Sequence, residues 1–166
     1  MVNYIISMRF YFFILFFLEI GLGECLISQT REIVPDLTAQ TDYEIGTSYA
    51  KKNQKKTLLY FRDSRSAGCL KMEKYILSDS LVKSRLNKDF VIVALLLNDQ
   101  TLLSEEKRSK LDNKKIVTVG DYYIYLQQSV YHNDTQPCFI VLDRNGIVGK
   151  TIGYTNTPLE FLKVLE

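Results

Sequence analysis

The run FVIVALLL, from Phe90 to Leu97, constrains the fold of this chain more than any other segment. Short apolar runs rich in β-branched residues are typical of strands that are buried on both faces. We therefore expect a central strand here. A second buried strand, KTLLYF, ends at Phe61, and segments with helical spacing separate the strands. This alternation predicts an α/β fold, in which helices pack on the faces of a sheet.

Helices are expected where a capping residue precedes apolar residues at helical spacing. The first covers about residues 43–50. The second begins at Ser66 or Ala67 and breaks near Ser78, which we expect to cap the next helix. The charged segment 104–115 is interpreted as a solvated helix or loop, with no function assigned.

The last third of the chain predicts a helix, a hairpin and a C-terminal helix. Thr118 opens the first of these helices with Asp121 near capping-box spacing. The strands CFIVLD and IVGKTIG are joined by Arg144, Asn145 and Gly146, and an Asn-Gly pair suits a tight turn. In TPLEFLKVLE, Thr157 is the expected cap, with proline in the first helical position and glutamate completing a capping box.

The N-terminal residues 1–23 are typical of an export signal. Arg9 is followed by the apolar run 10–18, and the small residues of GLG offer a cleavage site. An uncleaved membrane anchor is the alternative. Cys25 raises the further alternative of a lipid anchor, although Glu24 before it does not fit the small residue that lipidation favours. Residues 24–40 are interpreted as a polar linker, which leaves 41–166 as the folded domain.

Composition excludes some classes of function. The 166 residues carry 21 basic and 19 acidic side chains and are 46% hydrophobic, so the chain can bury a core and has no strong net charge. Without a basic patch interleaved with aromatics, nucleic acid is not expected as a partner. Three cysteines without metal-ligand spacing and a single histidine predict no metal site, and no cofactor is expected.

The stretch YFRDSRSAGCLKMEK places a lone thiol, Cys69, where a strand passes into a helix. A helix N-terminus presents unpaired N–H groups and partial positive charge, which favour a thiolate over a thiol. Two interpretations of Cys69 remain open: a reactive thiol, or a small buried hydrophobe. Ser66, three residues earlier, is well placed as the N-cap of the same helix.

From about residue 42 to the end, five segments follow one another in a recognisable order: DYEIGTSYAKKNQKK, GCLKME, DFVIVALLLND, TQP and LDRNGIVGKTIGYT. In these segments and their order, the chain resembles the thioredoxin-like domains of DsbD-type thiol:disulfide interchange proteins of the bacterial envelope. The resemblance implies a thioredoxin fold with a mixed four- to five-stranded sheet flanked by helices. It also implies a redox motif at the first strand-to-helix junction, with Pro137 as the cis-proline that faces it.

The chain departs from the family's Cys-x-x-Cys motif, because Ser66 stands where the attacking cysteine is expected. A serine hydroxyl is almost never ionised at neutral pH, so Ser66 cannot attack a disulfide. Tyr60 stands where the family usually has a proton-relaying aspartate. Cys138, directly after Pro137, is an addition to the pattern. We expect it to be buried in the core, and a disulfide to Cys69 is the alternative.

Two classes of function follow from these residues. The first is an exported thiol-disulfide redox protein of the periplasm or cell envelope that uses Cys69 as its single motif thiol, with Cys138 as a further candidate. The second is a non-catalytic peptide-binding or chaperone-like module that keeps a groove beside Pro137 for extended peptides. The partners expected are protein thiols or disulfides, extended peptide segments, and a redox partner in the membrane.

Overall fold

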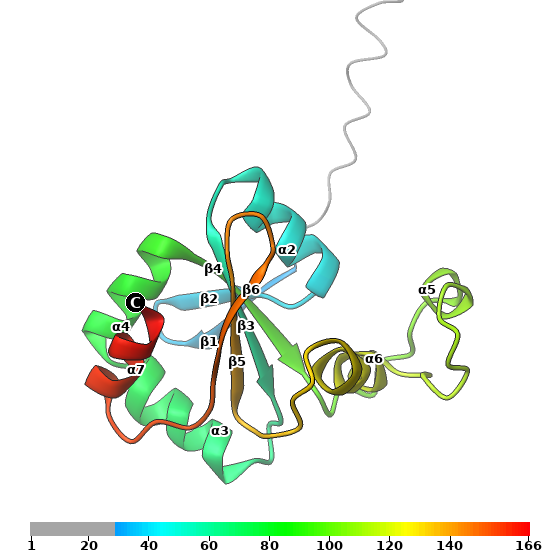
Figure 1. Ribbon diagram of the computed structural model, residues 1–166. Helices are drawn as coiled ribbons and strands as arrows, with labels where there is room; N and C mark the ends of the chain where they lie inside the picture. The colour runs from blue at the N-terminus through cyan, green and yellow to red at the C-terminus, as the bar shows by residue number, and fades with distance from the viewer. Residues whose placement is uncertain (1–28) are drawn as a thin grey trace, which may run out of the picture.

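The computed structural model describes residues 29–166, which form one mixed sheet with helices on both faces (Figure 1). The predicted α/β class is confirmed. The sheet has six strands in the order β1-β2-β4-β3-β5-β6, not the four or five expected. The strands are β1 (Thr30–Val34), β2 (Leu37–Gln40), β3 (Lys56–Arg62), β4 (Phe90–Leu96), β5 (Cys138–Leu142) and β6 (Val148–Ile152).

Strand β3 lies at the middle of the sheet. It pairs in parallel with β4 along its whole length and antiparallel with β5, with Phe61 opposite Cys138. Its five central side chains, from Thr57 to Phe61, are buried, and all residues of β4 except the last are buried too. The expectation that Phe90–Leu97 forms an interior strand is therefore confirmed, because both faces of β4 are covered.

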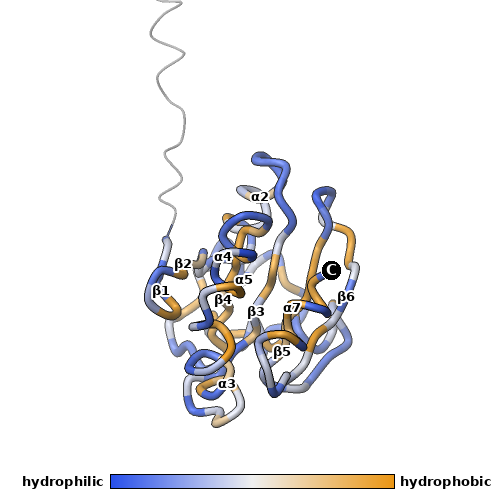
Figure 2. The backbone as a smooth tube through the Cα atoms, turned by 90° about the vertical axis from the view of Figure 1, so that its left-hand side faces the viewer, coloured by the Kyte–Doolittle hydropathy of each residue, from blue (hydrophilic) through white to orange (hydrophobic). Residues whose placement is uncertain are grey.

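The side chains of β3 alternate between two cores. Leu58 and Tyr60 belong to the core beneath η1, α4 and α7, whereas Leu59 and Phe61 belong to the core beneath α2 and α6. Figure 2 shows the resulting hydrophobic runs along the inner strands. The helices are α2 (Tyr43–Lys52), α3 (Ala67–Lys71), the π-helical turn η1 (Met72–Leu77), α4 (Ser80–Asp89), α5 (Glu105–Ser109), α6 (Val119–Tyr125), the π-helical turn η2 (Leu126–Val130) and α7 (Pro158–Leu165).

Residues 30–40 form a hairpin that joins the sheet, whereas the sequence analysis assigned residues 24–40 to a linker. β2 pairs in parallel with β4, and Leu37 and Ala39 are buried in the core. The hairpin turns at Asp36, whose φ of 65° is in the left-handed region. The strands are only five and four residues long, and their outward side chains are polar, so the hydrophobic pattern was too short to be recognised.

Side-chain caps begin the helices largely as expected. Thr118 and Asp121 form a complete capping box, and Thr157 accepts the N–H of Glu160 at the start of α7. For α4 the predicted cap was wrong. Asp79 caps this helix by accepting the N–H groups of two residues in its first turn, whereas Ser78 donates its hydroxyl to the carbonyl of Glu73.

The hairpin between β5 and β6 was predicted, but its turn is built differently from a two-residue Asn-Gly turn. Asp143 accepts the N–H groups of Asn145 and Ile147 through Oδ1, and its own N–H donates to the carbonyl of Ile147. Only Gly146 adopts a positive φ, of 86°. The aspartate side chain therefore organises a longer loop, which the Asn-Gly signal alone did not reveal.

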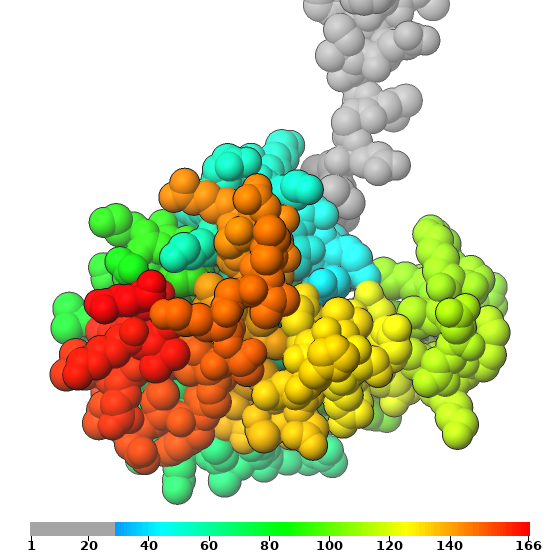
Figure 3. All heavy atoms as spheres, in the orientation of Figure 1, coloured from blue at the N-terminus to red at the C-terminus, as the bar shows by residue number. Residues whose placement is uncertain are grey.

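The segment around α5 extends from the body of the domain (Figure 3). Lys107 ties it to the start of α2 through ion pairs with Asp42 at 3.0 Å and Glu44 at 2.7 Å. The other charged groups of this segment face solvent, as the sequence predicted. Within residues 29–166, no helix is long and apolar enough to cross a membrane. The expected export signal, the alternative anchors and Cys25 lie outside the described residues.

A substitution of Gly120 tests whether the start of α6 depends on close contact with the backbone that follows β4. A Cβ at this position would lie 2.5 Å from the Leu97 carbonyl oxygen and 2.7 Å from that of Asp99. Alanine normally favours a helix over glycine by about 1 kcal/mol. Backbone cannot move aside as a flexible side chain can, so we expect Gly120→Ala to lower the free energy of unfolding by about 1–3 kcal/mol.

Urea unfolding of the two matched variants Gly120→Ala and Gly153→Ala checks this expectation. A Cβ at Gly153 would meet nothing within 4 Å, so this control should leave the unfolding midpoint nearly unchanged. Equal midpoints for the two variants would contradict the packing described for α6.

Candidate functional site

Cys69 is positioned by the passage from β3 into α3. After Arg62 ends the strand, Ser66 takes an extended conformation, with φ −71° and ψ 120°, and α3 begins at the next residue. The Ser66 Oγ accepts the N–H of Cys69 at 3.4 Å. The predicted N-cap is confirmed, so Ser66 has a structural role in addition to its place in the motif.

Hydrogen bonds hold the loop of residues 63–65 that precedes the motif. They come from side chains of the loop itself and from Asn98, which follows β4. Asp63 Oδ1 accepts the backbone N–H of Arg65, and the Arg65 guanidinium pairs with the same carboxylate. Asn98 accepts the N–H of Ser64 and donates to its hydroxyl. These contacts fix the path of the chain into the motif without using Ser66 or Cys69.

Pro137 faces the motif directly. The Gln136–Pro137 peptide bond is cis, which is the isomer expected from the sequence. A Cβ added at Gly68 would lie 3.0 Å from the Pro137 Cδ and 3.4 Å from the Gln136 carbonyl oxygen. The absence of a side chain at Gly68 therefore allows the motif helix and the proline segment to pack against each other.

The two cysteines of the described residues are free thiols with fully buried side chains. Cys138 belongs to the core beneath α2 and α6, which confirms the expectation of core burial. The structure thus favours two independent thiols over a disulfide between Cys69 and Cys138.

Burial has a chemical consequence for Cys138. Removal from water disfavours the charged thiolate and raises the pKa of Cys138 to about 11, although a hydrogen bond with Gln127 acts in the opposite direction. Cys138 is therefore a protonated thiol at neutral pH. This leaves Cys69 as the thiol of the motif helix.

A tyrosine, a glutamate and an arginine occupy the position behind the motif. Tyr60 donates its hydroxyl to Glu73 Oε1 at 3.0 Å, and Arg62 Nε donates to the same oxygen at 2.7 Å. Side chains of Arg62 and Glu73 are 16% and 12% exposed, so this ion pair is largely screened from solvent. The Tyr60 ring also stacks on Phe139, with ring centroids 4.4 Å apart.

Glu73 is a member of this cluster that was not predicted from the sequence. Two signals were present in the sequence. Tyr60 and Arg62 are two residues apart on a strand and so share one face, and Glu73 lies one helical turn beyond Cys69. The Glu73 carboxylate comes from η1, whereas the aspartate expected from the family pattern would stand on β3 at position 60. The sequence position of the acidic residue is therefore different.

Tyr60 does not supply the chemistry of the carboxylate that it replaces. Burial, followed by the nearby Cys69 and Glu73, raises the pKa of Tyr60 well above its ordinary value of 10.0. The phenol therefore remains protonated at neutral pH and acts as a hydrogen-bond donor.

No group of three or more potential ligands for a metal ion occurs within the part of the chain that the structure describes.

The mixed sheet, the capped motif at the end of β3 and the facing cis-proline together define a protein of the thioredoxin fold, here with a Ser-x-x-Cys motif. A family model described as a thioredoxin-like domain matches residues 44–166. The chain therefore belongs to the thioredoxin-like domain family. The recognition made from the sequence segments is confirmed.

Solved structures share the same fold at low sequence identity. The DsbH oxidoreductase is 22% identical, with a TM-score of 0.58 over 88% of this chain and 94% of that one. A thioredoxin from Thermus thermophilus is 17% identical, with a TM-score of 0.51 over 74% and 80% of the two chains. The oxidised C-terminal domain of DsbD from Neisseria meningitidis is 12% identical, with a TM-score of 0.50 over 75% and 94%. No curated protein matches the sequence.

The cluster behind the motif can be tested by removing its shared acceptor. Glu73→Ala leaves the Arg62 guanidinium and the Tyr60 hydroxyl without their partner in a largely buried place. We expect this change to lower the free energy of unfolding by about 2–3 kcal/mol, because a hydrogen bond to a charged group contributes about that much. Chemical denaturation measures the loss.

Two further variants give this test its controls. Tyr60→Phe keeps the stacking on Phe139 and should cost less, about 1 kcal/mol, since only the hydroxyl is lost. Glu106→Ala removes a fully exposed ion pair with Lys110 and should have no measurable effect. Equal stability of the Glu73 and Glu106 variants would contradict the assigned cluster.

Proposed function

We propose that this protein is an exported thioredoxin-like protein of the cell envelope that exchanges thiols and disulfides through the single motif thiol of Cys69. The observation that carries the proposal is the packing of the motif helix, which bears Cys69, against the cis-proline segment at Gly68. A likeness to a structure described as an oxidoreductase is compatible with this role. The proposed partners are protein thiols or disulfides, including a redox partner in the membrane.

The exchange proceeds in two displacement steps. The Cys69 thiol first loses its proton to solvent, and its thiolate attacks one sulfur of a substrate disulfide. A new disulfide forms between Cys69 and that sulfur, while the other substrate sulfur leaves as a thiolate. A thiol of a second protein or small molecule must then attack this mixed disulfide to release Cys69, because Ser66 cannot.

Access to Cys69 sets the rate of the first step. Its side chain is fully buried, whereas Ser66 is half-buried and Ala67 is exposed. In-line attack on a substrate disulfide therefore requires the start of α3 to move away from the proline segment. Such local opening is expected to be slower than reaction of an exposed thiol.

Export to the periplasm or cell envelope, with an anchor at the N-terminus as an alternative, is part of the same proposal. It rests on the basic residue, apolar run and small residues within positions 1–23.

The complete burial of Cys69 favours a second candidate function, a non-catalytic module that binds extended peptides. Gln136, which precedes the cis-proline, is exposed just before the start of β5. An extended peptide can pair with exposed backbone next to a strand without any nucleophile. Slow alkylation of Cys69 in the native protein, together with retained peptide binding, would favour this module over thiol exchange.

Restoring the missing thiol is the direct test of the proposed chemistry. Wild-type protein should show no sustained reduction of a model disulfide protein in excess dithiol, because nothing at position 66 resolves the mixed disulfide. Ser66→Cys should establish turnover, since the two side chains are close in size and the capped helix start is already formed. Turnover is expected to stay modest, because Tyr60 supplies no base.

Cys69→Ser is the control in the same assay and should be inactive. Wild-type turnover equal to that of the Ser66→Cys variant would overturn the single-thiol proposal. Activity that survives Cys69→Ser would place the chemistry at another residue.

A further inference from the structure

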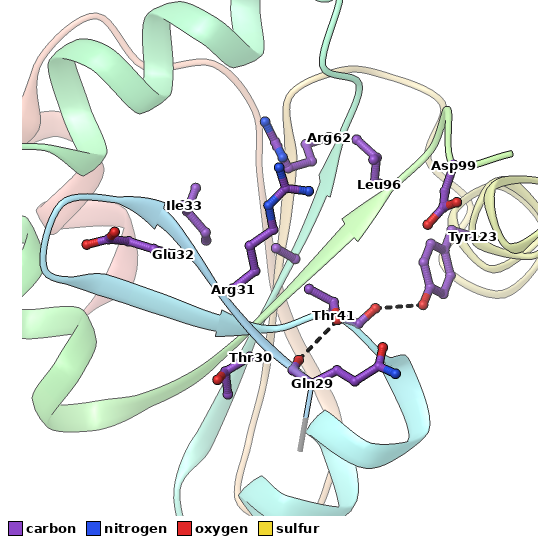
Figure 4. A pocket seen from close by; sticks show the side chains of 11 residues that line it. Gln29, Thr30, Arg31, Glu32, Ile33, Thr41, Arg62, Leu96, Asp99 and Tyr123 are labelled. Atoms are coloured by element: carbon purple, nitrogen blue, oxygen red, sulfur yellow. Dashed lines mark hydrogen bonds between the residues drawn. The ribbon is translucent and has the colours of Figure 1, made fainter. Parts of the chain in front are cut away.

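A cavity of about 490 Å³ opens between the β1–β2 hairpin and the ends of β3 and β4 (Figure 4). Its lining includes Arg62 and Leu96, the last residues of β3 and β4, together with Thr41, which follows β2. These three strands are parallel to one another, so the cavity lies at their carboxyl ends. This end of a parallel sheet is where α/β proteins commonly bind ligands, and the volume suits a small molecule.

Two arginines from different strands, Arg31 and Arg62, line the cavity. Their guanidinium groups overlap in the view of Figure 4. Arg62 uses its Nε to bind Glu73, which leaves its terminal nitrogens as donors. Arg31 has no ion-pair partner among residues 29–166, and a guanidinium presents its N–H groups as a fork that suits a carboxylate.

The other side of the cavity carries negative charge. Asp99 lies there beside Tyr123, and its Oδ1 is held by the N–H of Thr101 (Figure 4). Glu32 also lines the cavity, but its Oε1 accepts the N–H of Asp36 in the hairpin turn, which directs the carboxylate away from Arg31. The cavity is therefore dipolar, with a cationic side and an anionic side.

We infer that this cavity binds a short peptide as its zwitterion, with the terminal carboxylate between Arg31 and Arg62 and the terminal ammonium at Asp99. Ile33, Ala94 and Leu96 in the lining offer apolar contacts to small side chains. The site uses neither Cys69 nor Ser66, so it goes beyond the proposed thiol chemistry and stands independently of it. Arg62 connects the two, because its Nε holds the Glu73 that lies behind the motif.

Triglycine is a suitable probe, because its flexible backbone extends to at most about 10 Å and can bend to reach both charged sides. Two-dimensional amide NMR of the ¹⁵N-labelled protein should show binding that shifts residues 30–33 and Asp99. N-acetyl-triglycine lacks the ammonium and triglycinamide lacks the carboxylate. Each should therefore bind at least about tenfold more weakly than triglycine, as expected when a charged hydrogen bond is lost.

Matched variants assign the binding to the charged side chains. Arg31→Gln should weaken triglycine about tenfold, whereas Arg144→Gln, an equally exposed arginine in the β5–β6 loop, should not change its affinity. Asp99→Asn should weaken triglycine but leave N-acetyl-triglycine unaffected. Binding should persist in Cys69→Ser, which separates this site from the thiol proposal.

Three results would overturn the inference. The first is the absence of any triglycine-dependent shift in wild-type protein. The second is equal affinity of wild type and the Arg31→Gln variant. The third is equal affinity of triglycine, its N-acetyl form and its amide, which would show binding without recognition of the termini.

Discussion

The pairing of β3 with β4 on one edge and β5 on the other is the constraint on which the rest of this structure depends. The parallel register with β4 and the antiparallel register with β5 bury both faces of β3 and send its side chains into two cores. The same pairing sets Phe61 opposite Cys138, so the end of β3 lies beside Pro137. The motif and the cis-proline therefore meet as a result of strand register, and Gly68 lets them pack closely.

Much of this arrangement could be predicted from the sequence, and the failures have physical causes. Interior strands were found because burial on both faces leaves an unbroken apolar run, as in Phe90–Leu97. Ser66 and Thr118 were found because capping is local. The β1–β2 hairpin was missed because its short strands bury few residues, and Glu73 because its partners, Tyr60 and Arg62, come from another element. Contacts between segments that are far apart in the sequence produce no periodic pattern of residues, so they are hard to predict from a single sequence.

The chemistry left at the motif differs from that of a dithiol enzyme in two respects. Ser66 caps the start of α3, and because a serine hydroxyl is almost never ionised at neutral pH, it is not expected to act as a nucleophile. Behind it, a neutral phenol and a paired carboxylate replace a free proton acceptor. Cys138 is a free thiol buried in the core beneath α2 and α6.

The lifetime of the mixed disulfide at Cys69 tests the central claim most directly. Reduced native protein is mixed with oxidised glutathione near neutral pH, quenched with acid and mapped by peptide mass spectrometry. The account predicts one glutathione on Cys69 of the wild type, stable until a thiol is added, and its rapid loss in the Ser66→Cys variant. An unmodified Cys69 in native protein that reacts readily once unfolded would contradict single-thiol exchange.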